Sequence, residues 1–493
     1  MSFSGLHDEP AAPTAVLDQA APVRIPAARI PAARIPAARI AADDLTDLRS
    51  RVHGPVYAAG DDSMAAEVAT WNVAITHTPA VAVGATCAED VAAAVSFARR
   101  HGLRVAVQAT GHGPVRNADG SLMVTTRRMQ GVHVDPVRRT ARVEAGVKWE
   151  RVMEAAAQHG LAGMRGSSSD VGVVGYTLGG GLGSFGREHG FAADHVRSLE
   201  LVTADGAIRT VCAESEPELF WAVRGGKGNL GIVTQIEIDL LPVRELVGGG
   251  VFFDGVDAAR LLHTYRTWAP TLPEEATTSI AILRMPPMDF VPEPLQGRTV
   301  VHLRYANTGA DLAESERLVA PMLAAGHPLL GFLHPMLVTE MDAIHMDPVD
   351  PLPAWEKGMG LAELSAEAVD ALLAVAGPQA EIPLLMVELR QLGGALSRQP
   401  QVPNAVAGRD VPWELFVLGP ALPELAEVLP LVGRGVLGAL APWAAEGGLF
   451  NHLGDVSGPE EVARVYPPET LRRLREVKAA VDPDGMFTSG HAI

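Results

Sequence analysis

The sequence predicts an α+β protein with two folded parts, of which the second is built on an antiparallel sheet. Three observations support this fold class. The chain has 493 residues, of which 47% are hydrophobic, so it can bury a substantial core divided between two or three domains. The spacing of apolar residues in 81–108 predicts a strand, a helix and a second strand. Residues 299–419 contain strand-like runs with two helical patterns between them, as an α+β layer requires.

The N-terminal segment differs from the rest of the chain. Residues 24–40 repeat Arg-Ile-Pro-Ala-Ala, and this period of five fits neither a helix nor a strand. Each proline also removes a backbone hydrogen-bond donor. We therefore expect residues 1–41 to be a disordered leader produced by repeat expansion, with a docking arm as the alternative, and no catalytic residue before position 42.

The globular pattern begins near Asp43. Apolar residues at helical spacing predict a helix over 88–101, between strands at 81–83 and 104–108. In the second part, strands are predicted at 299–305, 384–390 and 413–419, and helices at 310–320 and 367–375. The proline-rich residues 346–353 are expected to form a loop at the edge of this layer.

Composition limits the possible partners. The formal net charge is −18, because 58 Asp and Glu outnumber 40 Lys and Arg. A protein this acidic repels nucleic acid and anionic membranes, so we expect a small-molecule substrate. The chain has no signal-peptide pattern, no run of about 18 apolar residues and only two cysteines, which predicts a cytoplasmic location. The histidines have no HxH or HExxH spacing, so no metal is assigned.

Two segments carry the strongest functional signal. Residues 105–114 run from an apolar strand into His112, which glycines flank, and residues 166–183 contain seven glycines. Glycine lets main-chain amides approach a large flat ligand, which suggests a flavin. The G-x-G-x-x-G strings at 181–186 and 226–231 would instead indicate a nicotinamide site, but such a string must open a helix. The second string precedes a strand-like run and the first lies late in the glycine run, so the flavin is favoured.

The order of these motifs resembles the flavin domain of the vanillyl-alcohol-oxidase superfamily, in particular its berberine-bridge-enzyme-like and 6-hydroxy-nicotine-oxidase-like group. The matching blocks are residues 110–113, 170–183, 194–206, 218–234, 388–395, 404–410, 449–452 and 466–493. The resemblance implies a two-part PCMH-type FAD-binding domain over residues 42–243, with its core at about 73–243. Residues 448–493 would complete it, and residues 244–447 would form the substrate domain.

The resemblance also implies the residues that hold FAD. His112 would be bonded covalently to the C8 methyl group of the ring. Many relatives have a second link through a cysteine, but Ser168 stands at that position, so a single attachment is expected. Loop amides would cradle the pyrophosphate, and the small side chain of Val171 would admit dioxygen. The full set is Gln108, Ala109, Thr110, Gly111, His112, Gly113, Ser168, Asp170, Val171, Gly175, Gly179, Gly180, Gly181, Gly183, Val233 and Asn451.

Hydride transfer to flavin requires a base beside the reacting carbon. The group usually has Asn-Tyr in its closing motif, whereas this chain has Asn451 and His452. Histidine can act as a base near neutral pH, so His452 is the first catalytic candidate. Glu414 and Tyr176 are the next two. Glu388 and Arg390 are expected to form a structural ion pair or a hydrogen-bonding set in the sheet.

These observations predict an FAD-dependent oxidoreductase that takes hydride from an alcohol, amine or activated carbon and passes the electrons to dioxygen. Apolar stretches with methionines at 282–288 and 330–336 are compatible with a bulky secondary-metabolite substrate, although such stretches commonly form core. Two alternatives stay open. One is a carbohydrate oxidase, and the other is a flavin-binding cyclase or isomerase without net redox turnover.

Overall fold

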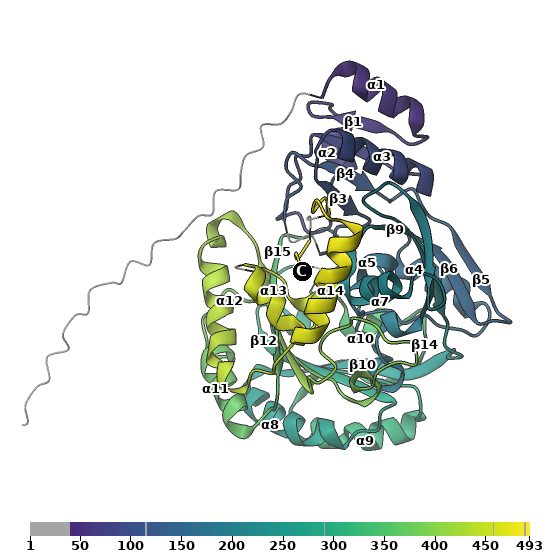
Figure 1. Cartoon of the computed structure of the whole chain (residues 1–493). Coiled ribbons are helices and arrows are strands. Elements are labelled where there is room, and N and C mark those ends of the chain that lie inside the picture. Colours follow the sequence, from purple (N-terminus) through teal and green to yellow (C-terminus); the bar gives the residue numbers. More distant parts are fainter. Residues whose placement is uncertain (1–39, 114–115, 290, 457, 488–489) are drawn as a thin grey trace, which may run out of the picture. The chain divides into compact units, whose positions relative to one another are not determined.

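Three sheets follow one another along the chain in the computed structural model, which describes residues 40–113, 116–289, 291–456, 458–487 and 490–493 (Figure 1). The first sheet has the order β1-β2-β4-β3, in which β4 runs parallel to both β2 and β3. Its strands and the accompanying helices are α1 (Ala42–Arg51), β1 (Val56–Ala58), α2 (Met64–Glu67), β2 (Val81–Gly84), α3 (Ala88–Arg100), β3 (Val105–Gln108) and β4 (Leu122–Thr125). Helix α3 places Val91, Val95 and Phe97 in the core of this layer.

The second sheet is antiparallel and has the order β5-β6-β9-β7-β8. Its elements are β5 (Val132–Asp135), β6 (Thr140–Glu144), α4 (Trp149–Ala157), α5 (Val173–Leu178), α6 (Gly186–His189), β7 (Val196–Val202), β8 (Ile208–Cys212), α7 (Pro217–Gly226) and β9 (Ile232–Asp239). The glycine string 226–231 leads directly into β9. Apart from one 3-10 turn at Lys227–Asn229 it opens no helix, whereas a nicotinamide-binding loop would open an α-helix.

The third sheet has eight antiparallel strands in the order β13-β10-β12-β11-β16-β17-β15, with β14 also paired to β10. These strands are β10 (Glu245–Asp254), β11 (Ala276–Arg284), β12 (Thr299–Asn307), β13 (Pro328–Leu330), β14 (His334–Leu337), β15 (Ala354–Leu361), β16 (Met386–Gln391) and β17 (Trp413–Pro420).

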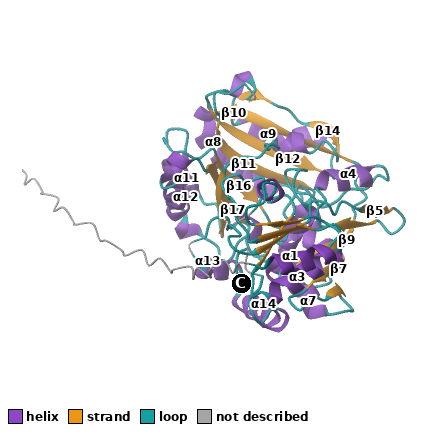
Figure 2. Ribbon diagram, turned by 90° about the horizontal axis from the view of Figure 1, so that it is seen from above, coloured by secondary structure: helices purple, strands orange, loops and turns teal. Residues whose placement is uncertain are grey.

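Helices cover one face of this third sheet (Figure 2). They are α8 (Ala258–Trp268), α9 (Leu312–Ala324), α11 (Ala366–Ala376) and α12 (Val428–Ala439). Alternation along the strands explains the packing: Val387 and Leu389 of β16 join the core beneath these helices, while Glu388 and Arg390 point to the opposite face. The short helix α10 (Asp342–His345) lies on that opposite face, against β10 and β12.

The C-terminal segment returns to the first two sheets. Helix α14 (Pro468–Val481), which follows α13 (Pro459–Val465), packs Leu474 into the same core as Phe220 of α7. Beyond it, the backbone N–H of Val105 in β3 donates to the carbonyl of Met486 at 2.9 Å. The end of the chain therefore supports the strand that leads to His112.

The predicted α+β class with an antiparallel sheet is confirmed. The expected helix over 88–101 is α3, and the expected strands near 299, 384 and 413 are β12, β16 and β17. Almost all of the expected leader lies outside the described residues, and the first helix begins at Ala42. No helix in the described part of the chain has the length and apolar character needed to span a bilayer.

Candidate active site

The two glycine-containing segments meet in space. A Cβ built on Gly172 would lie 3.4 Å from Oγ1 of Thr110, in the loop that follows β3. Residues 70–72 hold this loop, because the backbone N–H groups of Trp71 and Asn72 donate to the carbonyls of Thr110 and Gly111 at 3.2 and 3.1 Å. Gly111 has φ +76°, and a Cβ there would lie 2.7 Å from Cα of Thr70. Only glycine fits this position without displacing the supporting segment.

His112 has a defined orientation in this loop. Its ring stacks on Trp71 with 4.5 Å between centroids and 18° between planes. Its Nε2 lies 3.1 Å from Oδ2 of Asp170, whose other oxygen accepts from the Lys148 ammonium. Burial lowers the pKa of His112, and the opposing effect of Asp170 does not offset it. The imidazole is therefore neutral near pH 7.

The loop has the free groups that FAD would need. Within the described residues, the backbone amides of residues 110–113 donate to no protein acceptor. Cβ atoms built on Gly113 and Gly175 would meet no atom within 4 Å, so open space adjoins both segments. Free amides in a glycine-rich loop bind phosphate oxygens. These residues fit FAD, with residues 110–113 suited to the pyrophosphate and Gly175 to close approach of the ring.

Other members of the expected FAD set have structural partners. Gln108 donates to the carbonyl of Ala69 at 2.8 Å, and Val233 is a buried residue of β9. Ser168 accepts at its hydroxyl from the backbone N–H of Asp170 at 3.2 Å. Gln108 and Ser168 thus bond to backbone groups of the supporting segments, and Val233 lies in the core.

Tyr176, a catalytic candidate, packs inside the glycine segment. Cβ atoms on Gly166, Gly181 and Gly183 would lie 2.9, 2.7 and 3.1 Å from its side chain. Burial raises the pKa of Tyr176, and its hydroxyl has no hydrogen-bond partner among the described residues. The absence of side chains at these glycines thus provides the space for the tyrosine ring.

The segment 449–452, called the closing segment below, contacts the C-terminal half of α5 through Asn451. Asn451 donates from Nδ2 to the carbonyl of Tyr176 at 2.8 Å and accepts at Oδ1 from Nζ of Lys227 at 3.1 Å. A Cβ on Gly179 would lie 2.0 Å from the same Oδ1, so the asparagine occupies the space that a larger residue would fill. Burial lowers the pKa of Lys227. Asn451 therefore fixes the closing segment to the glycine segment.

The adjacent His452 faces the third sheet. Its Nδ1 lies 2.8 Å from Oε2 of Glu414 in β17, and Glu414 is only 1% exposed. Its ring lies 5.1 Å from that of Phe416, and a Cβ on Gly358 of β15 would lie 3.1 Å from Cβ of His452. Burial raises the pKa of the neighbouring Glu356. The structure thus pairs two of the three catalytic candidates, whereas the Tyr176 hydroxyl bonds to neither of them in the described part of the chain.

A charged cluster continues from Glu414 along the sheet face. Arg390 lies opposite Glu414 in the register of β16 and β17, and its Nε donates to Glu388 at 2.9 Å. Glu388 also accepts from Ser279 at 2.6 Å and from Arg304. Burial alone would raise the pKa of Glu388, but Arg390 and Arg304 hold it well below its usual value. The expected ion pair between residues 388 and 390 is therefore present.

A cavity of about 30 Å³ lies between this face and the end of the glycine segment. Its lining includes Leu182, Ser184, Ser279, Arg304 and Arg390. The methionine-bearing stretches lie elsewhere: Met336 is buried in a separate core cluster, and Met288 is 51% exposed. The cavity is lined by both apolar and polar side chains, and it includes no residue of the stretches 282–288 and 330–336.

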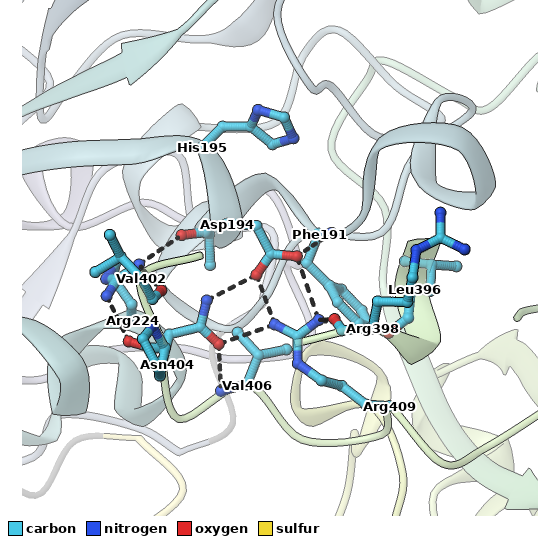
Figure 3. A network of polar contacts seen from close by, with 12 residues as sticks. Phe191, Asp194, His195, Arg224, Leu396, Arg398, Val402, Asn404, Val406 and Arg409 are labelled. Carbon is cyan, nitrogen blue, oxygen red and sulfur yellow. Dashed lines mark hydrogen bonds and ion pairs between the residues drawn. The ribbon is translucent and has the colours of Figure 1, made fainter. Parts of the chain in front are cut away.

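A polar network holds the glycine segment in place (Figure 3). Arg409 donates to both carboxylate oxygens of Asp194, at 2.5 and 3.2 Å, and Asn404 donates to the same carboxylate at 2.7 Å. The backbone N–H of Ala193 next to it donates to the carbonyl of Gly180 at 2.9 Å. The network therefore connects the loop at 404–409 with the glycine segment.

Sequence reasoning did not predict four residues of the site, which are Trp71, Lys148, Lys227 and Arg304. Three of them meet their partners only through the tertiary fold, so no local pattern marks them. Lys227 has one signal, since it is a long charged side chain within a glycine string.

Comparisons with known proteins agree with this geometry. The FAD binding domain family matches residues 79–211. The (R)-6-hydroxynicotine oxidase of Paenarthrobacter nicotinovorans is 27% identical over 481 residues, covering 90% of this chain and 97% of that protein. The chain therefore contains an FAD binding domain and is similar along most of its length to an FAD-linked oxidase.

Solved structures share the fold of this enzyme. The 6-hydroxy-D-nicotine oxidase of Arthrobacter nicotinovorans superposes with a TM-score of 0.76 and 25% identity, over 90% of this chain and 98% of that one. The carbohydrate oxidase of Microdochium nivale has a TM-score of 0.76 and 20% identity, over 91% and 99% of the two chains, and supports the fold alone. The predicted resemblance, the FAD-binding domain and the oxidoreductase class are confirmed.

Proposed function

We propose that this enzyme is an oxidase that removes hydride from an alcohol, amine or activated carbon of a mid-sized organic molecule and passes the electrons to dioxygen. The observation that carries the proposal is the 2.8 Å contact between His452 and Glu414, next to the residue that binds the glycine segment. When bound, FAD supplies the hydride acceptor.

His452 acts as the base in this proposal. With Nδ1–H donated to Glu414, Nε2 carries the lone pair that accepts the proton of the substrate hydroxyl or amine. The carboxylate fixes the tautomer and the ring orientation, and it compensates the positive charge that forms on the imidazole. Glu414 is therefore a positioning residue, because it acts through His452.

The attachment of FAD at His112 is part of the proposal. The neutral imidazole, its stacking on Trp71 and the open space beside Gly113 support a single covalent link there. Residues 110–113, Gly175 and the segment 179–183 would hold the cofactor. Ser168 supports single attachment, because a hydroxyl is a much weaker nucleophile than a thiolate.

The substrate we propose is polar. Three residues that line the cavity, Thr277, His345 and Gln391, each have a buried polar atom without a hydrogen-bond partner in the described part of the chain. A buried polar group without a partner costs about 1–3 kcal/mol, so a ligand that pairs with these atoms gains affinity. A cavity of about 30 Å³ holds one or two water-sized groups, so a substrate would reach these atoms with a single polar substituent. A hydroxylated heterocycle or a sugar supplies such a group. An oxygen-rich secondary metabolite does so as well, and sugar oxidation is the second candidate.

Anaerobic mixing tests the proposal. Bleaching of the flavin's visible absorbance by (R)-6-hydroxynicotine or by an oligosaccharide, followed by peroxide formation on admission of oxygen, is the expected result for one of these classes. Product formation without bleaching would instead support a non-redox cyclase or isomerase. The variant His452→Asn serves as the control, since it should bind FAD normally but bleach slowly.

A further inference from the structure

The Asp170 carboxylate lies between the side chains of His112 and Lys148 and accepts no hydrogen bond from the described backbone. Its Oδ2 faces Nε2 of His112 at 3.1 Å, and its Oδ1 accepts from Lys148. In the part of the chain that the structure describes, neither oxygen accepts from a backbone amide. The Asp170 side chain is 11% exposed, whereas the Lys148 side chain is 41% exposed and reaches solvent. The buried carboxylate therefore interacts only with His112 and Lys148 among the described residues.

Trp71 determines the plane in which Asp170 meets the imidazole. The indole stacks on the His112 ring, and its Nε1 donates to the carbonyl of Val349 at 2.8 Å. The backbone N–H of Leu352 donates to the carbonyl of Trp71 at 3.1 Å, and the N–H of Val73 donates to the carbonyl of Leu352 at 3.2 Å, which holds the same segment. The stacking fixes the ring plane, and the contact with Asp170 fixes the rotation of the ring within it. The imidazole is thus held in one orientation before any ligand binds.

We propose that Asp170 is the base through which the protein attaches FAD to its own His112, with Trp71 positioning the ring. The inference rests on the proposed attachment at His112. In the tautomer that donates Nε2–H to Asp170, Nδ1 carries the lone pair and is the bonding atom. Lys148 compensates the charge of the carboxylate and connects it to solvent.

The step balances in atoms and electrons. A bond would form between Nδ1 of His112 and the carbon of the C8 methyl group, and that methyl group would lose one proton to water. The proton on Nε2 passes to Asp170. The electron pair of the broken C–H bond would stay in the ring system, and dioxygen would accept these two electrons with two protons to give hydrogen peroxide.

The variant Asp170→Asn tests the role of the carboxylate. The amide keeps the size of the side chain but cannot accept the proton, so the protein should bind FAD while the rate of covalent attachment falls by about a hundredfold or more. FAD bound to the native protein is measured by visible absorbance, and the covalent fraction by the flavin that stays in the acid-precipitated pellet. Asp170→Glu should restore part of the rate, and His112→Ala should give no acid-stable flavin.

Asp342→Asn is the matched control. Asp342 accepts from the backbone N–H of Ser169 at 2.9 Å and so supports the same segment without contacting His112. This variant should attach FAD at the wild-type rate. If it loses attachment as Asp170→Asn does, Asp170 has only a structural role and the inference is wrong.

Two further outcomes separate the inference from the proposed function. If the wild-type protein releases all of its flavin in acid, the attachment at His112 is wrong and the inference fails with it. If the wild type retains flavin and Asp170→Asn links FAD at an equal rate, only the role of Asp170 is overturned. Should Asp170→Asn not fold, the linkage isomer in the wild-type flavopeptide decides: a bond at Nδ1 supports the inference, and a bond at Nε2 overturns it.

Discussion

The network around Arg409 should contribute strongly to stability. The side chains of Arg409 and Asp194 are 5% and 8% exposed, so both charges are buried. Replacing Arg409 with methionine leaves the Asp194 carboxylate in the interior, with Asn404 and the backbone N–H of Phe191 as donors. Removing one partner of a buried ion pair costs about 3–5 kcal/mol.

The expected change in melting temperature follows from the size of the chain. An unfolding entropy of about 2.1 cal/mol/K per residue gives about 1 kcal/mol/K for the 493-residue chain. Arg409→Met should therefore lower Tm by about 3–5 °C, measured by differential scanning calorimetry at one scan rate. Arg398→Met is the control, because Arg398 pairs with Glu274 at 2.7 Å while 57% exposed. An exposed pair contributes about 0–1 kcal/mol, so this variant should melt within about 1 °C of wild type. If Arg409→Met also melts within that interval, the network does not stabilise the fold as argued.

Three other changes test the site and its electrostatics. His452→Asn should slow anaerobic flavin reduction by about 10²–10⁴-fold, and Glu414→Gln by about tenfold, since a charge-assisted hydrogen bond becomes a neutral one. Gly111→Ala should reduce the flavin content of the purified protein, because the residue has φ +76° and its Cβ would overlap the supporting segment. Burial lowers the pKa of His491 to about 3. The unfolded chain therefore binds a proton below about pH 6.5 that the folded chain does not, and stability falls as the pH is lowered toward 3. His491→Gln should reduce the loss of stability between pH 7 and 5 by about 2 kcal/mol, measured by urea unfolding.

Each of these results has a clear contrary outcome. Flavin reduction at the wild-type rate in His452→Asn would exclude the imidazole as the base. Full flavin content in Gly111→Ala would show that the loop adapts to a side chain. Equal pH profiles for wild type and His491→Gln would show that other groups account for the acid sensitivity.

Local patterns in the sequence predict the elements of this fold well. The helix at 88–101 and the strands near 299, 384 and 413 depend on the spacing of apolar residues within one segment, and the structure has all of them. The glycine positions are also predictable, because φ values such as +77° at Gly181 leave little choice of residue.

The pairing of charged residues could not be predicted in this way. Glu414 meets His452 because β17 lies between β16 and β15, and that strand order depends on packing across the whole sheet. The contact of Trp71 with His112 likewise joins two loops whose proximity depends on the first sheet. The sequence predicts His452 and Glu414 as separate candidates, and their contact is visible only in the folded structure.

The two histidine–carboxylate pairs lie at opposite ends of the same short helix. Asp170 precedes α5 and faces His112, whereas Asn451 packs on Gly179 at the C-terminal end of α5 and carries His452 with it. In each pair the carboxylate engages one ring nitrogen and leaves the other for chemistry. Attachment and proton removal should therefore be separable by mutation, since distant sites act nearly additively. Arg409→Met loosens the contact with Gly180, so it should slow flavin reduction and leave the amount of acid-stable flavin unchanged. Asp170→Asn should lower the amount of acid-stable flavin. In Asp170→Asn protein that retains FAD without a covalent link, the rate of flavin reduction should be unchanged. Loss of both functions in either variant would mean that α5 and its flanking residues respond as one unit.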